Sequence, residues 1–172
     1  MKYGEIKTND IANGEGVRTS LFVSGCTHHC KGCFNPDTWS FDFGNEFTSK
    51  EKELIFESVK PDWIDGLSLL GGEPFEPENQ KVLYPFLVEF KEKFPTKNIW
   101  CYSGYTYEEL TGDSRASIDI TKEMLSLIDV LVDGEFKLEL KDISLKFKGS
   151  SNQRIIDVKK TMEKGSIVLY DI

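Results

Sequence analysis

The chain has 172 residues, a length typical of a single domain and sufficient to bury a hydrophobic core. Its formal net charge of -8 disfavours binding to the phosphate backbone of nucleic acids. No apolar stretch approaches the roughly 20 residues of a membrane span, residues 1–10 are polar, and four cysteines are too few for a disulfide scaffold. We therefore expect one cytoplasmic domain, residues 1–172, that contacts neither membrane nor nucleic acid.

The first apolar run, residues 17–23, predicts a strand, and it leads into CTHHCKGC with Cys26, Cys30 and Cys33. Three thiolates on one loop suit either an iron-sulfur cluster with an iron left over or a zinc ion that needs another donor. Zinc sites usually pair two knuckles, and the only other cysteine, Cys101, lies far downstream. The spacing therefore favours a cluster and leaves zinc as the alternative.

Two histidines, His28 and His29, lie inside this loop. They could complete a zinc site, but two adjacent ligands so close to the cysteines would strain a tetrahedral shell. We expect them to shape the loop or to donate hydrogen bonds to the cluster sulfurs. Cys101 is expected to be an apolar core side chain.

Helices and strands alternate through the rest of the chain. Thr48 and Glu51 form a capping-box pattern that opens a helix to about Lys60. Apolar spacing predicts a second helix over residues 82–94, kinked or delayed by Pro85, and a third over residues 121–128. The further strands are predicted at residues 67–70, 99–102, 130–132, 154–158 and 167–170.

Glycine-rich polar loops follow four of these strands. They begin at Ser24, Gly71, Ser103 and Asp133. In parallel α/β folds the loops at the carboxyl ends of the strands share one rim, so we expect these loops to converge on a site.

The cysteine loop and the Gly71-Gly72-Glu73-Pro74 turn resemble those of the radical S-adenosylmethionine enzymes. Within that family the chain is similar to the activating enzymes of anaerobic ribonucleotide reductases. The lead-in DIANGEGVR, residues 10–18, and the segment GSSNQR, residues 149–154, carry this closer resemblance. Gly32 departs from the wider family, which usually has an aromatic residue there, and we expect Phe34 to supply the packing.

The resemblance implies a partial, open (β/α) barrel with mostly parallel strands. It implies that Cys26, Cys30 and Cys33 hold three irons of a 4Fe-4S cluster and that the fourth iron binds S-adenosylmethionine. An electron from the cluster would cleave the sulfonium, giving a 5'-deoxyadenosyl radical, with no catalytic residue beyond the cluster. The implied S-adenosylmethionine contacts are Phe34, Asn35, Gly71, Gly72, Glu73, Ser103, Tyr105, Asp133, Asn152 and Arg154. For Arg154 a surface ion pair is the alternative.

The implied partner is the large subunit of anaerobic ribonucleoside-triphosphate reductase, which receives a glycyl radical. The length allows only five or six strand-helix units, so the barrel should stay open and admit a protein substrate. Because no second cysteine cluster or flavin fingerprint occurs, the electron should come from an external donor such as flavodoxin. The alternatives are an activase of another glycyl-radical enzyme, a small-molecule radical enzyme, and a zinc-stabilised binding module.

Overall fold

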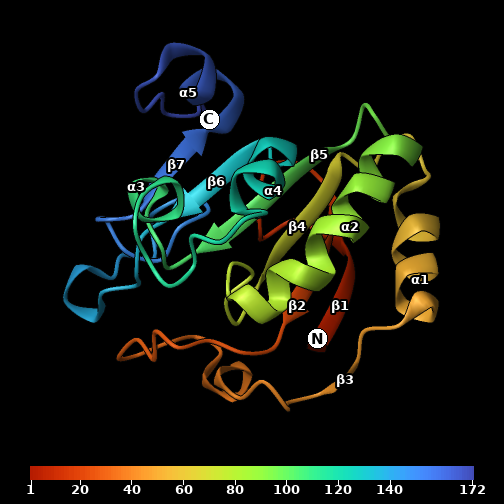
Figure 1. Cartoon of the computed structure of the whole chain (residues 1–172), viewed down its shortest axis with the longest axis horizontal. Coiled ribbons are helices and arrows are strands. Elements are labelled where there is room, and N and C mark those ends of the chain that lie inside the picture. The colour runs from red at the N-terminus through yellow and green to blue at the C-terminus, as the bar shows by residue number, and fades with distance from the viewer.

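The computed structural model describes all 172 residues and contains one seven-stranded sheet, ordered β3-β1-β2-β4-β5-β6-β7 (Figure 1). The strands are β1 (Lys2–Asp10), β2 (Arg18–Val23), β3 (Asn45–Glu46), β4 (Gly66–Gly71), β5 (Asn98–Ser103), β6 (Val130–Asp133) and β7 (Arg154–Asp157). The α-helices are α1 (Ser49–Val59), α2 (Pro77–Lys93), α3 (Tyr107–Thr111), α4 (Thr121–Leu127) and α5 (Val158–Lys164). No helix is both long enough and apolar enough to cross a membrane.

Strands β2, β4, β5 and β6 are parallel neighbours at the centre of the sheet. The outer strands β1 and β7 are antiparallel to their central neighbours, and β3 pairs antiparallel with β1. Strand β7 reverses because residues 134–153 contain no crossover helix, which a parallel connection would need. The sheet is not closed, since β3 and β7 are its two edges. The predicted open α/β architecture is therefore confirmed.

Helices α1, α2 and α4 lie on one face of the sheet (Figure 1), where the main hydrophobic core forms. The capping box predicted at Thr48 and Glu51 is present, and α1 begins at the next residue after Thr48. Helix α2 begins at Pro77 and contains Pro85 in its interior, so the predicted delay at Pro85 is wrong. Proline suits the first turn of a helix because the donor that it lacks would have no intrahelical partner there.

At the two ends of the chain the structure differs from the strands expected from the sequence. Residues 167–170 form no strand, and only an isolated bridge joins Leu169 to Ile156. Leu169 is 62% exposed, so this segment lacks the buried face that stabilises a strand. Conversely, β1 was not predicted, because most of its side chains are polar or exposed and it has little apolar alternation.

Candidate metal centre

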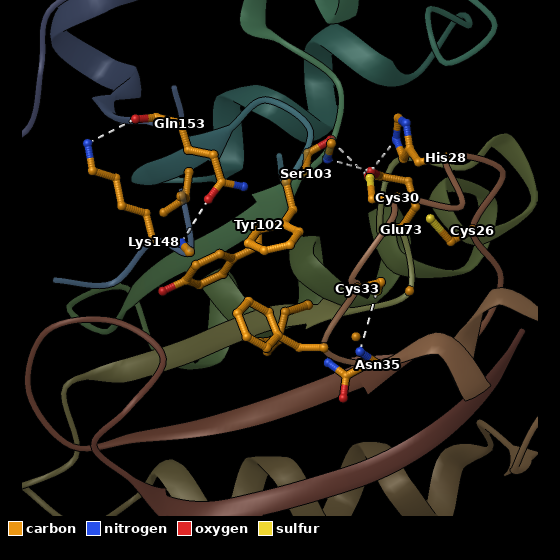
Figure 2. Close-up of a pocket in the computed structure, with 18 of the residues that line it drawn as sticks. Cys26, His28, Cys30, Cys33, Asn35, Glu73, Tyr102, Ser103, Lys148 and Gln153 are labelled. Atoms are coloured by element: carbon orange, nitrogen blue, oxygen red, sulfur yellow. Dashed lines mark hydrogen bonds and ion pairs between the residues drawn. The ribbon is translucent and has the colours of Figure 1, made fainter. Parts of the chain in front are cut away.

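A cavity of about 410 Å³ lies against the sheet, on the face opposite α1, α2 and α4 (Figure 2). Phe22, Leu70, Tyr102 and Val132 of four adjacent strands line it, whereas their chain neighbours, such as Leu21, point into the helix-covered core. This follows from the alternation of side chains along a strand. The loops after β2, β4, β5 and β6 all contribute to the lining. Their predicted convergence is confirmed.

All three cysteines of the loop after β2 line this cavity as unpaired, partly buried thiols. The backbone N–H of Cys26 donates to the carbonyl of Trp39 (3.1 Å), and that of Cys33 donates to the carbonyl of Cys30 (3.1 Å). Burial, reinforced by the charge of Glu73, raises the pKa of the Cys26 thiol to about 12, and burial also raises the pKa of Cys30. The thiols of Cys26 and Cys30 are neutral until a cation displaces their protons, as happens on metal binding.

The donors around the cavity fit a cluster held by three thiolates. Cys101 is fully buried in the hydrophobic core, as predicted, and cannot join the other three. Both ring nitrogens of His28 are engaged by carboxylates, Nε2 by Glu73 (2.9 Å) and Nδ1 by Glu135 (3.0 Å), so they are not free for the predicted contacts with sulfur. The ring of His29 is stacked on a tryptophan, with centroids 4.5 Å apart. Nowhere do three His, Cys, Asp or Glu side chains surround the position of a single metal ion.

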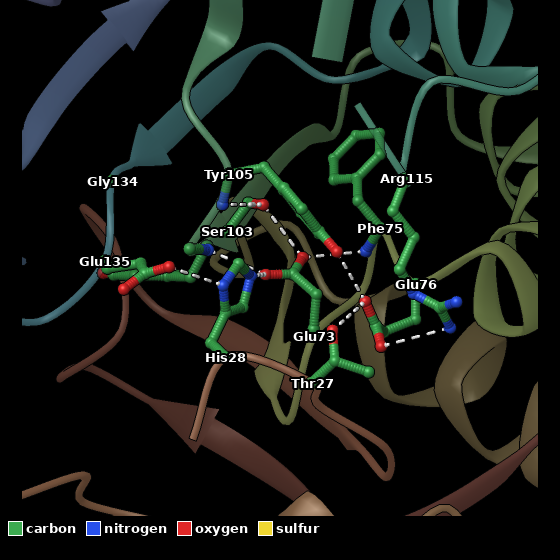
Figure 3. Close-up of polar contacts among 12 residues, drawn as sticks. Thr27, His28, Glu73, Phe75, Glu76, Ser103, Tyr105, Arg115, Gly134 and Glu135 are labelled. Atoms are coloured by element: carbon green, nitrogen blue, oxygen red, sulfur yellow. Dashed lines mark hydrogen bonds and ion pairs between the residues drawn. The ribbon is translucent and has the colours of Figure 1, made fainter. Parts of the chain in front are cut away.

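A single carboxylate, Glu73, links the cysteine loop to the turns that follow β4 and β5 (Figure 3). Its side chain is buried, and Oε1 accepts from the N–H of Gly104 (2.7 Å) and contacts Nε2 of His28. Oε2 accepts from the hydroxyl of Ser103 (2.8 Å) and the N–H of Phe75 (2.9 Å). A carboxylate has about four lone-pair positions, so these contacts occupy them all. Glu73, one of the expected S-adenosylmethionine contacts, lines the cavity, and its carboxylate is bonded to donors of the protein itself.

His28 is held as a cation between Glu73 and Glu135. Burial lowers its pKa, but the hydrogen bonds and charges of the two carboxylates outweigh burial and raise the pKa to about 9. The imidazolium therefore donates from both nitrogens at neutral pH. Gly104 permits this close approach, because a Cβ there would lie 2.6 Å from Nε2 of His28.

A second buried acid, Glu76, also joins the cysteine loop to the turn after β5 (Figure 3). Its Oε1 accepts from the hydroxyls of Thr27 (3.1 Å) and Tyr105 (2.9 Å). Its Oε2 has no hydrogen-bond partner, and Arg115 lies 3.9 Å away. The ring of Tyr105 also packs edge-on against His28, with centroids 4.4 Å apart. Tyr105, one of the expected S-adenosylmethionine contacts, thus supports the cysteine loop and does not line the cavity.

The other predicted ligand contacts divide into two groups. Those that line the cavity are Phe34, Asn35, Gly71, Gly72, Glu73 and Ser103. Asp133 and Arg154 lie outside it and pair with each other through Nε–Oδ1 (3.0 Å) and Nη2–Oδ2 (2.6 Å) contacts. Asn152 donates to the carbonyl of Glu135 (2.8 Å). Arg154 was expected to contact the ligand or to form a surface ion pair. The structure shows an ion pair, in which the Arg154 side chain is partly exposed and the Asp133 side chain is buried.

The lead-in segment contributes cavity residues that sequence reasoning did not assign. Ala12 and Asn13 line the cavity, and the buried carboxylate of Asp10 holds both, accepting from the N–H of Ala12 (2.9 Å) and Nδ2 of Asn13 (2.7 Å). The guanidinium of Arg18 is fully buried and donates to the hydroxyl of Ser68 (2.7 Å). The resemblance of residues 10–18 to the activating enzymes was the sequence feature that could have pointed to these residues.

Residues 134–149 contact the cysteine loop, a role that the sequence analysis did not assign to them. Gly32 has φ +77, and a Cβ there would lie 2.8 Å from Cδ1 of Leu138. Both the backbone conformation and this contact explain why glycine replaces the usual aromatic residue. The rings of Phe34 and Phe136 pack with centroids 5.0 Å apart, so Phe34 does supply aromatic packing beside the third cysteine.

The comparisons agree with this site. The model of the 4Fe-4S single cluster domain family matches residues 12–156, and the chain belongs to that family. The names of its relatives indicate a narrower group within that family. The chain is 43% identical over 157 residues to the anaerobic ribonucleoside-triphosphate reductase-activating protein of Pasteurella multocida, covering 90% of this chain and 96% of the relative. The proteins of the same name from Haemophilus influenzae (44% over 157 residues, 90% and 97% coverage) and Escherichia coli strain K12 (39% over 155 residues, 89% and 96%) are similarly related. The resemblance predicted from the sequence is confirmed.

Proposed function

We propose that this chain is an iron-sulfur activating enzyme that generates a glycyl radical on the large subunit of anaerobic ribonucleoside-triphosphate reductase, using S-adenosylmethionine. One observation supports it most directly: three unpaired thiols of one loop line a single cavity, apart from the fourth cysteine. The names of relatives that match about nine-tenths of the chain support the choice of reductase. The whole chain, residues 1–172, would act as one domain of a partial radical S-adenosylmethionine barrel.

In this proposal Cys26, Cys30 and Cys33 hold a 4Fe-4S cluster. When bound, the cluster supplies a low-potential electron that cleaves the sulfonium of S-adenosylmethionine, with a flavodoxin-like protein as external donor. The protein residues position and shield the reactants. Gly71 and Gly72 line the cavity at the end of β4, where a Cβ would lie 2.7 Å from the backbone of Val23 and from the carbonyl oxygen of Gly25, so glycine lets this turn pack against the cysteine loop.

The unclosed sheet supports a large substrate. The sheet ends at β3 and β7, which do not pair with each other. An unclosed architecture leaves room for a segment of another protein to approach the cavity. Phe34 and Phe136 pack together beside the cavity, where they would limit the access of water to the reacting groups.

The proposal is tested by loading the protein with iron and sulfide under anaerobic conditions and adding dithionite, S-adenosylmethionine and the reductase. Electron paramagnetic resonance should then show an organic radical on the reductase that depends on S-adenosylmethionine. A Cys30→Ser variant, treated identically, is the matched control and should give no radical. Failure of the loaded wild-type protein to produce a radical on the reductase would contradict the proposal, and transfer only to another glycyl-radical enzyme would assign a different partner.

A further inference from the structure

The GSSNQR segment, which carries part of the sequence resemblance, closes the loop that precedes it. Gln153 joins the two ends of residues 134–149, which we call the covering loop. The Nε2 of Gln153 donates to the carbonyl of Gly134 (2.9 Å), and its Oε1 accepts from the backbone N–H of Gly149 (2.8 Å). One side chain therefore holds both ends of the covering loop together, as in compact loops of the Ω type.

A second side chain of the same segment, Asn152, holds the start of the covering loop. Its Nδ2 donates to the carbonyl of Glu135 (2.8 Å), next to the Gly134 carbonyl that Gln153 binds. We call the side chains of Asn152 and Gln153 the clip. The covering loop contains no α-helix and no strand, only the 3-10 turn Leu138–Leu140. Because no regular ladder pairs its backbone groups, bonds such as those of the clip fix its position.

The residue that follows the two clipped carbonyls lies against the cysteine loop. Burial and the charge of Glu135 raise the pKa of the Cys30 thiol, whereas a hydrogen bond from the backbone N–H of Phe136 lowers it. The ring of Phe136 also packs on that of Phe34, with centroids 5.0 Å apart. The clip therefore fixes the part of the covering loop that contacts one of the three thiols expected to hold the cluster.

The covering loop also forms a wall of the cavity. Its lining residues are Gly134, Phe136, Leu145, Phe147, Lys148 and Gly149. Gln153 lines the cavity as well, and its carbonyl accepts from Nζ of Lys148 (3.0 Å; Figure 2). Most of these side chains are apolar, so the wall limits the access of water to the space that the thiols face.

We propose that Asn152 and Gln153 are positioning residues of the metal centre, which hold the covering loop against the cysteine loop and thereby control the retention and the reduction potential of the cluster. This inference rests on the proposed function, because it requires the cluster. Hydrogen bonds to the sulfurs and exposure to solvent both tune an iron-sulfur cluster, and the covering loop contributes to both. Neither side chain touches S-adenosylmethionine in this proposal, in contrast to the ligand contact first expected for Asn152.

Neutral substitutions test the clip without adding charge near the cluster. Gln153→Met removes the bonds to both ends of the covering loop with little change of volume, and Asn152→Ala removes the bond to the neighbouring carbonyl. Ser151→Ala, at the exposed residue between them, is the matched control in the same segment. Lys91→Met is the control for stability, because it breaks an ion pair with Asp129 (2.7 Å), which precedes β6 at the end of the sheet away from the cavity.

Each variant is loaded with iron and sulfide under anaerobic conditions. The rate of iron release to a chelator and the reduction potential of the cluster are then measured, together with the free energy of unfolding of the metal-free protein. We expect Gln153→Met to release iron about tenfold faster than wild type. Its reduction potential should be lower, because a lost N–H bond to sulfur no longer favours the more negative, reduced cluster.

Asn152→Ala should shift both quantities in the same direction by less. Ser151→Ala should match wild type, and Lys91→Met should lose stability yet keep the release rate and the potential of wild type. A wild-type value of either quantity in Gln153→Met would overturn the proposal. If that variant does not fold, Asn152→Ala decides by the same criterion.

Two other outcomes would also contradict the proposal. Equally fast iron release from Lys91→Met would show that the clip acts only through global stability. A wild-type release rate and potential in Asn152→Ala, combined with weaker binding of S-adenosylmethionine, would make Asn152 a ligand contact. A wild-type protein that takes up no cluster is a separate result, which refutes the proposed function itself.

Discussion

The Nε2 atom of His28 lies 2.9 Å from Oε1 of Glu73, and this contact joins the cysteine loop to the turn after β4. The same carboxylate accepts from Ser103 and Gly104 after β5. The three loops are therefore joined through one buried carboxylate. Glu73 acts in this account as a positioning residue for the cysteine loop.

Replacing Glu73 should destabilise the metal-free protein strongly. Glu73→Gln substitutes an amide NH₂ for one oxygen and leaves buried donors without an acceptor, so the free energy of unfolding should fall by about 3 kcal/mol. The control is Glu135→Gln, at the more exposed partner of His28, where the loss should stay below about 1 kcal/mol. Urea denaturation of the metal-free proteins measures both. Equal losses would show that Glu73 has no special role in holding the loops.

The stability of the metal-free protein should fall as the pH rises from 6 to 8. The folded pKa of His28 is about 9, above its value of about 6.5 in an unfolded chain. The stabilisation is therefore fully present below pH 6.5 and is lost as the pH rises through 9, with a decrease on the order of 2 kcal/mol by pH 8. The Cys26 thiol, whose pKa is about 12, does not titrate in the folded state over this range. His28→Gln should flatten the profile, and an unchanged slope would contradict this role.

Substitutions of the four cysteines should differ in their effect on iron binding. Serine at position 26, 30 or 33 should abolish the binding of iron and sulfide, because each substitution removes one of three thiolates on the loop. Cys101→Ala should retain full iron content and cost about 1 kcal/mol in stability, since Cys101 lies in the hydrophobic core. Chemical analysis of anaerobically loaded variants checks this. Loss of iron from Cys101→Ala would place that residue at the metal site.

Arg154 should stabilise the fold without contacting S-adenosylmethionine. Arg154→Ala leaves the buried Asp133 carboxylate without its cation and should cost about 3 to 5 kcal/mol. Glu108→Gln, at the exposed second partner of Arg154, should cost less than about 1 kcal/mol. Equilibrium binding to the folded, cluster-loaded Arg154→Lys variant should show an unchanged affinity for S-adenosylmethionine. A large loss of affinity there would instead support the ligand contact first expected for this residue.

The central strands and the main helices could be predicted because their signals are local. Apolar runs gave β2, β4, β5 and β6, and the capping box at Thr48 located the start of α1. Strand β1 lacks such a signal, because it is stabilised by pairing with β2 and not by its own apolar pattern. The direction of β7 depends on the absence of a crossover helix, which local periodicity does not encode.

The thiols and the glycine loops of the site were also predictable, because ligand spacing and strand ends are sequence features. The hydrogen-bond partners of the polar side chains were not predictable from the sequence. Asp133 ends β6 and Tyr105 follows β5, two strands that end at the cavity, yet the polar atoms of these residues bond to Arg154 and Glu76. Such pairings join residues far apart in the chain, so only the folded arrangement distinguishes a ligand contact from a supporting one.

The central claim is a cluster held by three thiolates with one iron open to S-adenosylmethionine. Its most direct test is the electron paramagnetic resonance spectrum of the anaerobically loaded, dithionite-reduced protein, recorded with and without S-adenosylmethionine. The account predicts about four irons per chain and a cluster signal that changes when S-adenosylmethionine is added. A signal that stays the same, or a protein that takes up zinc and no iron, would contradict it.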